Sequence, residues 1–111
     1  MGITIGDWDN RGQWSVHLSN MYSHAGHRVV RLADSVSLEM QERLAGLARG
    51  NQLFEKGESG NVWTDRGVEL GVNEAGWAWA SVFYDIDNDG DKEIFVTNGN
   101  TSHEDQNAPD F

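Results

Sequence analysis

The sequence contains no cysteine and a single proline among its 111 residues. Without cysteine no disulfide can stabilise the fold, although bound calcium can take over that cross-linking role in a secreted protein. Basic residues are also scarce, because 8 Lys and Arg stand against 18 Asp and Glu, and the formal net charge is −10. This balance argues against binding to nucleic acid or to anionic membrane surfaces, which attract clusters of Lys and Arg.

Long apolar runs are missing as well. No stretch of about eighteen apolar residues occurs, so the sequence predicts no transmembrane helix and no insertion into a membrane. A chain of this length accommodates one small domain at most. The hydrophobic content of 38% and the five tryptophans favour a small β-rich unit over a disordered segment.

The most informative stretch is the acidic loop at residues 85–93, in which carboxylates alternate with other residues around Gly90. Calcium takes about six to eight oxygen ligands, and short Asp side chains at positions 1, 3 and 5 of a tight loop can converge on one ion. These positions are Asp85, Asp87 and Asp89. Position 6 must turn sharply and is glycine, and position 7, Asp91, would offer its backbone carbonyl. The alternative is a solvated acidic turn, in which carboxylates this close would repel one another.

The flanking residues show what kind of calcium loop this is. An EF-hand requires a Glu at position 12, which here is Val96. Residues 76–84 alternate in the period of a strand, and residues 93–98 form a second short apolar run. The acidic loop therefore joins two strands. In that setting we expect the remaining side-chain ligand at position 9, Glu93, and we expect Lys92 to point into solvent.

The acidic loop has a counterpart near the start of the chain, since residues 6–20 align without a gap on residues 84–98. The alignment pairs Asp7 with Asp85, Asp9 with Asp87, Asn10 with Asn88, Gly12 with Gly90 and Asn20 with Asn98. The first copy has Arg11 at position 5 and Ser15 at position 9, so we expect it to bind calcium weakly or not at all. One hypothesis is that the Arg11 guanidinium replaces the metal by pairing with Asp7 and Asp9; the other is that Arg11 points into solvent.

The pattern between the two copies is different. Val36, Met40, Leu44 and Leu47 recur at helical spacing, which predicts an amphipathic helix from residue 34 to 49 that covers an apolar surface, with Asp34 or Ser35 as its N-cap. A partner-binding helix is the alternative. Residues 51–55 and 61–65 then predict a β-hairpin across a glycine-bounded turn.

Three segments, GDWDNRGQWSVHLSNM, LFEKGESGNVWTD and GVNEAGWAWASVFYDIDNDGDKEIFVTNG, resemble FG-GAP/VCBS repeats of integrin-α-like β-propellers. The resemblance is greatest to the repeats that precede the ASPIC/UnbV domain in cartilage-acidic-protein-like chains, and it covers residues 1–20 and 51–99. In that family each blade is a small antiparallel sheet that holds calcium in the loop between its first two strands. The implied ligands are Asp85, Asp87, Asp89, Asp91 through its carbonyl, and Glu93. Two features depart from the family: Glu at the ninth position, where Asp is usual, and the inserted helical segment.

The resemblance implies a mainly β fold of antiparallel β-propeller blade repeats, about one and a half blades, with one inserted amphipathic α-helix. The chain divides into a first repeat at residues 1–33, a helical insertion at 34–50, a hairpin plus second repeat with the calcium loop at 51–99, and a polar tail at 100–111. A propeller needs about four to eight blades. We therefore expect neighbouring blades, from a longer chain or from self-association, and favour the longer chain because exposed edge strands aggregate.

The implied function is that of a structural and adhesive interaction module with a protein or glycan ligand. Its expected location is extracellular or at the cell surface, periplasmic or secreted if the source is bacterial. No nucleophile with an adjacent base is visible in the sequence, so we expect no enzyme. Two alternatives are the non-catalytic propeller portion of a larger secreted enzyme, and a glycan-binding module that uses exposed tryptophans such as Trp14 and Trp63.

Overall fold

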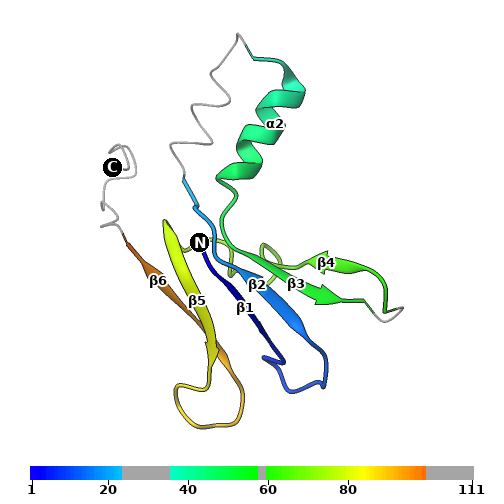
Figure 1. Cartoon of the computed structure of the whole chain (residues 1–111), viewed down its shortest axis with the longest axis vertical. Coiled ribbons are helices and arrows are strands. Elements are labelled where there is room, and N and C mark those ends of the chain that lie inside the picture. Colours follow the sequence, from blue (N-terminus) through cyan, green and yellow to red (C-terminus); the bar gives the residue numbers. More distant parts are fainter. Residues whose placement is uncertain (24–35, 58–59, 100–111) are drawn as a thin grey trace.

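The computed structural model describes residues 1–23, 36–57 and 60–99 of the chain. Within these residues the fold is mainly β, with antiparallel sheets and one helix, as the sequence predicts (Figure 1). The elements in chain order are β1 (Ile3–Gly6), β2 (Ser15–Leu18), α2 (Leu38–Leu47), β3 (Gln52–Lys56), β4 (Trp63–Asp65), β5 (Ala78–Tyr84) and β6 (Glu93–Asn98). The polar tail lies outside the described residues.

The first sheet has four strands in the order β1-β2-β3-β4, and every neighbouring pair is antiparallel. Strands β2 and β3 pair directly, with His17 opposite Leu53, although the helix lies between them in sequence. The predicted hairpin is confirmed, because β3 pairs with β4 and Lys56 stands opposite Trp63. The hairpin thus completes the sheet of the first repeat, and residues 51–99 are shared between the two sheets.

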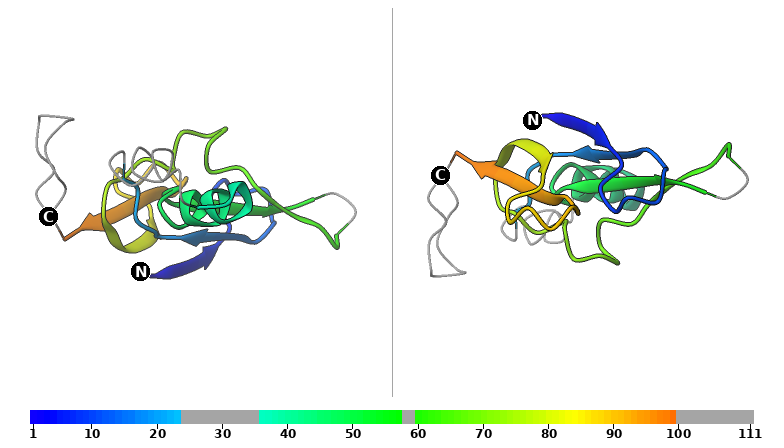
Figure 2. Two further views of the ribbon diagram at one scale, coloured as in Figure 1. Left: turned by 90° about the horizontal axis from the view of Figure 1, so that it is seen from above. Right: turned by 90° about the horizontal axis from the view of Figure 1, so that it is seen from below.

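The second sheet consists of β5 and β6 and packs on one face of the first sheet (Figures 1 and 2). His17 Nδ1 lies 2.8 Å from Ser81 Oγ, and the rings of His17 and Phe83 meet edge to face with centroids 6.3 Å apart. Leu53 and His17 are fully buried on the first sheet, while Phe83 and Ala78 are buried on the second. The core therefore lies between the two sheets.

Each sheet leaves its other face open. Alternating residues of a strand point to opposite faces, and directly paired residues share a face. On the first sheet, Ile3 and Ile5 lie on the face opposite to the second sheet and are exposed. On the second sheet, Val82 and its partner Phe95 are exposed together with Tyr84. Both outer faces of the two-sheet packing therefore carry exposed apolar side chains.

The helix α2 departs from its prediction. It begins after Ser37, whose Oγ accepts a hydrogen bond from Met40 N at 3.4 Å, so neither Asp34 nor Ser35 is the N-cap. None of its residues is buried, and the exposure of its large apolar residues runs from 37% for Leu44 to 79% for Leu38. The expectation that it covers an apolar surface is wrong for the described residues, because the apolar stripe of the helix is exposed and the helix projects beyond the sheets (Figure 1). Among the described residues no helix is long and apolar enough to cross a membrane.

Candidate metal centre

The acidic loop joins β5 to β6 as a tight connection, closed at its base by the pairing of Tyr84 with Glu93. Two of its residues have left-handed backbone conformations, Asn88 with φ 60° and Gly90 with φ 98°. Asn and Gly are the residues that adopt this conformation most readily. The order of residue types therefore fits the bend that brings the start and the end of the loop together.

Three of the five predicted ligand residues converge. Asp85, Asp87 and Asp89 each offer one carboxylate oxygen, and these oxygens all lie within 4.8 Å of one another. Backbone amides hold the side chains in place: Gly90 N donates to Asp85 Oδ2 at 3.1 Å, Asp89 N to Asp87 Oδ1 at 3.3 Å, and Asp91 N to Asp89 Oδ1 at 2.9 Å. The loop thus presents carboxylates at positions 1, 3 and 5 to a common point.

One oxygen of the Asp85 carboxylate lacks a hydrogen-bond partner among the described residues. Asp85 Oδ1 is buried and, among the described residues, accepts no hydrogen bond. A buried carboxylate oxygen without a partner is unfavourable unless a proton donor or a cation satisfies it. The converging donor atoms of Asp85, Asp87 and Asp89 are carboxylate oxygens, which suit hard cations such as calcium better than zinc or copper. The residues present therefore fit a calcium ion.

The other two predicted ligand residues direct their carboxylates elsewhere. Asp91 Oδ1 accepts a hydrogen bond from Asn10 Nδ2 at 2.8 Å, which leaves the predicted ligand role of the Asp91 backbone carbonyl untested. Glu93 Oε2 accepts a hydrogen bond from Ile86 N at 2.9 Å and so ties the two ends of the loop together. Neither carboxylate belongs to the converging group, and the ligand role of Glu93 stays a prediction.

Lys92 does not point into solvent as expected. Its Nζ donates to the backbone carbonyl of Asp7 at 2.9 Å, and its backbone N donates to the carbonyl of Trp8 at 3.0 Å. The expectation was wrong because the first loop of the chain packs beside the acidic loop, and a contact over such a sequence separation leaves no local signal.

The first loop, residues 7–14, repeats the turns of the acidic loop. Asn10 and Gly12 have φ values of 55° and 76°, matching the left-handed pair in the acidic loop. Gly12 N donates to Asp7 Oδ2 at 2.8 Å and Arg11 N donates to Asp9 Oδ1 at 3.4 Å, which reproduces two of the hydrogen bonds of the acidic loop. The gap-free alignment of the two copies therefore corresponds to a shared backbone conformation.

Arg11 pairs with only one of the two carboxylates that the hypothesis assigns to it. Its Nε forms an ion pair with Asp9, which confirms that partner, but its second partner is Glu55 Oε1 at 3.0 Å rather than Asp7. The negative charge of Asp9, followed by that of Glu55, raises the pKa of Arg11. Glu55 was missed in the sequence because it lies on β3, far along the chain from the first loop.

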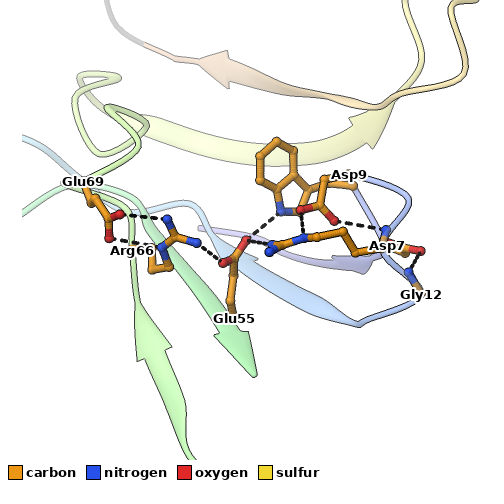
Figure 3. Close-up of polar contacts among 8 residues, drawn as sticks. Asp7, Asp9, Gly12, Glu55, Arg66 and Glu69 are labelled. Atoms are coloured by element: carbon orange, nitrogen blue, oxygen red, sulfur yellow. Dashed lines mark hydrogen bonds and ion pairs between the residues drawn. The ribbon is translucent and has the colours of Figure 1, made fainter. Parts of the chain in front are cut away.

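Glu55 lies between two guanidinium groups (Figure 3). It is 8% exposed and accepts hydrogen bonds from Trp8 Nε1 at 3.1 Å and from Arg66 at 2.6 Å, in addition to the contact with Arg11. Burial alone would raise the pKa of Glu55, but the hydrogen bonds from Arg66 and Trp8 and the charges of both arginines outweigh it and lower that pKa. Arg66 also bridges to Glu69 at 2.8 Å. This ion-pair cluster anchors the first loop to β3.

Comparisons with models of protein families, with curated proteins and with solved structures gave no match. The resemblance to FG-GAP/VCBS repeats therefore stays a prediction. Any proposal about function therefore depends on the converging carboxylates of the acidic loop and on the packing of the two sheets.

Proposed function

We propose that the acidic loop binds one calcium ion and that the chain is a calcium-binding FG-GAP/VCBS repeat segment of a β-propeller, with a structural and adhesive role. The observation that carries this proposal is the convergence of Asp85, Asp87 and Asp89, each of which offers one carboxylate oxygen within 4.8 Å of the others. The Asp91 carbonyl and Glu93 would complete the ligand set.

Bound calcium would neutralise the mutual repulsion of the carboxylates and fix the turn between β5 and β6. The three converging side chains are half-buried or exposed, so water can complete the coordination shell. We expect a dissociation constant of about 10⁻⁴ to 10⁻³ M, the range of extracellular calcium modules. An extracellular or cell-surface location belongs to the same proposal.

The stacking of the two sheets supports a blade-like repeat. Ile5 and Phe83 occupy equivalent positions in the two copies, yet Ile5 is 59% exposed and Phe83 is 9% exposed. The converse holds on the other face, where His17 is fully buried and its equivalent Phe95 is 51% exposed. The exposed face of the first sheet is therefore equivalent to the face by which the second sheet packs on the first. The exposed face of the second sheet is equivalent to the face by which the first sheet packs on the second.

Such an interface is head-to-tail and can continue in both directions. A preceding sheet would cover Ile3 and Ile5, and a following sheet would cover Val82, Tyr84 and Phe95. The four-stranded antiparallel meander of the first sheet is also the form of a propeller blade. We propose that neighbouring blades, from a longer chain or from further copies, occupy these faces.

The calcium site is tested by isothermal titration calorimetry and by thermal unfolding across a calcium series. The informative variant is Asp87→Asn, which removes a charged ligand but keeps an oxygen that can accept the hydrogen bond from Asp89 N. We expect at least about tenfold weaker binding, because a neutral amide is a much poorer ligand for a hard cation. Glu42→Gln, a matched loss of one charge on the exposed helix, should bind as the wild type does. Wild-type protein that shows neither heat of binding nor a calcium-dependent midpoint would refute the site.

A second candidate function is glycan binding, because Trp14 and Trp63 are 65% and 45% exposed. Trp63 stands opposite Lys56 on β3, and Trp14 precedes Ser15, whose partner is Glu55, so both indoles belong to the same end of the first sheet. Exposed indole faces stack on the apolar faces of sugars. Affinity electrophoresis in soluble polysaccharides tests this: retardation that Trp14→Ala and Trp63→Ala both abolish supports it, whereas unretarded wild-type protein counts against it.

A further inference from the structure

The first loop and the acidic loop are joined by four hydrogen bonds, which we call the loop clasp. Two come from Asn10, whose Nδ2 donates to the backbone carbonyl of Gly90 at 2.5 Å and to Asp91 Oδ1 at 2.8 Å. The other two come from Lys92, which donates from its backbone N to the carbonyl of Trp8 and from its Nζ to the carbonyl of Asp7. The clasp therefore reaches from one sheet to the other.

Asn10 contacts the acidic loop at the place where its backbone would meet the ion. Gly90 and Asp91 are positions 6 and 7 of the loop, and the carbonyl at position 7 is the predicted backbone ligand. By holding the Gly90 carbonyl, Asn10 fixes the peptide unit between these two residues. By holding Asp91 Oδ1, it also keeps that carboxylate turned toward the first loop.

We infer that the first loop, which has lost carboxylates at positions 5 and 9, positions the metal loop of the next repeat, so that calcium binding and packing of the two sheets are coupled. This inference rests on the proposed calcium site. A loop that is already held in its binding conformation loses less conformational freedom when the ion binds, so its affinity is higher. By linkage, calcium must strengthen the clasp by the same factor by which the clasp strengthens calcium binding.

The test compares calcium binding to the wild type and to Asn10→Gly by calorimetry. Glycine is the appropriate replacement because the backbone at residue 10 is left-handed, with φ 55°, and glycine adopts this conformation without strain. Loss of the two hydrogen bonds should weaken binding by roughly three- to tenfold. Gln13→Ala, which removes an exposed amide side chain from the same loop, should leave the affinity unchanged.

A second readout is hydrogen exchange at the Lys92 amide, which donates to Trp8 across the clasp. Calcium should slow this exchange in the wild type and slow it less in Asn10→Gly. Should Asn10→Gly fail to fold, Lys92→Met keeps the aliphatic stem, removes the contact with Asp7, and should weaken binding by about two- to fivefold.

The possible failures are distinguishable. Wild-type binding with unchanged affinity and exchange in the clasp variants would overturn the coupling and leave the calcium site standing. Absence of calcium binding in the wild type would overturn both proposals. Weaker binding in Gln13→Ala to the same degree as in Asn10→Gly would also overturn the coupling, because it would show a general loosening of the first loop.

Discussion

The first loop and the acidic loop share the same turns of the backbone but differ in charge at position 5. Both begin with Asp, turn through a left-handed Asn and a left-handed Gly, and hold their first Asp by a hydrogen bond from that Gly. The first loop contains Arg11 at position 5, paired with Asp9 and Glu55, whereas the acidic loop places Asp89 there beside two more carboxylates. Positions 1, 4 and 6 are therefore common to the two turns, while position 5 holds a protein cation in one loop and a further carboxylate in the other.

In the first loop Arg11 supplies part of the charge balance that a cation would supply in the proposed calcium site. A guanidinium can hold two carboxylates at once in fixed geometry, which is part of what a calcium ion does. The replacement is incomplete, because Asp7 Oδ1 is buried and, like Asp85 Oδ1, has no hydrogen-bond partner among the described residues. The first loop thus shares this feature with the acidic loop as well.

Glu55 is the residue whose removal should disturb the first loop most. Glu55→Ala leaves the guanidinium groups of Arg11 and Arg66 without their shared partner, and we expect the free energy of unfolding to fall by about 2–3 kcal/mol. This is measured by urea unfolding. Glu69→Ala, which removes an exposed partner of Arg66, should lower the free energy of unfolding much less than Glu55→Ala does, because exposed ion pairs contribute little. Equal effects of the two variants would show that the buried cluster does not hold the first loop.

A carboxylate at position 5 of the first loop should turn it into a second calcium site. Arg11→Asp places a third carboxylate at position 5 and removes the protein cation, so we expect a second calcium to bind and the calorimetric stoichiometry to rise from about one to two. At calcium about tenfold above the dissociation constant this would stabilise the fold by roughly 1.4 kcal/mol. Arg11→Ala is the control and should keep a single site. An unchanged stoichiometry in Arg11→Asp would mean that position 5 alone does not separate the two loops.

The features that the sequence predicts correctly are local. The spacing of Asp85, Asp87 and Asp89 around Gly90 determines the turn and the convergence, since each contact in it spans only a few residues. The alternation in β5 and the glycine-bounded hairpin of β3 and β4 are likewise properties of short segments. The antiparallel β-rich fold follows from these patterns.

The features that the sequence missed join distant segments. Arg11 meets Glu55 and Lys92 meets Asp7 only because the sheets bring their strands together. From the sequence alone, any other acidic residue or backbone carbonyl would be an equally good partner for these two cations. The expectation that the helix covers an apolar surface was wrong for a related reason. The stripe of Met40 and Leu44 shows that α2 is amphipathic, but whether a surface lies beneath it depends on the pairing of β2 with β3.

The smallest expected effect concerns the interface between the sheets, where His17 is buried while its equivalent Phe95 is exposed. Burial lowers the pKa of His17. Unfolded histidine titrates near 6.5, so below that pH the unfolded state binds more protons than the folded state, and stability is full above this value and declines as the pH falls. We expect a loss of roughly 0.5–1 kcal/mol between pH 7 and pH 5.5 from this residue. Urea midpoints of the wild type and of His17→Gln at both pH values measure it, and an equal decline in both proteins would assign the pH dependence to other groups.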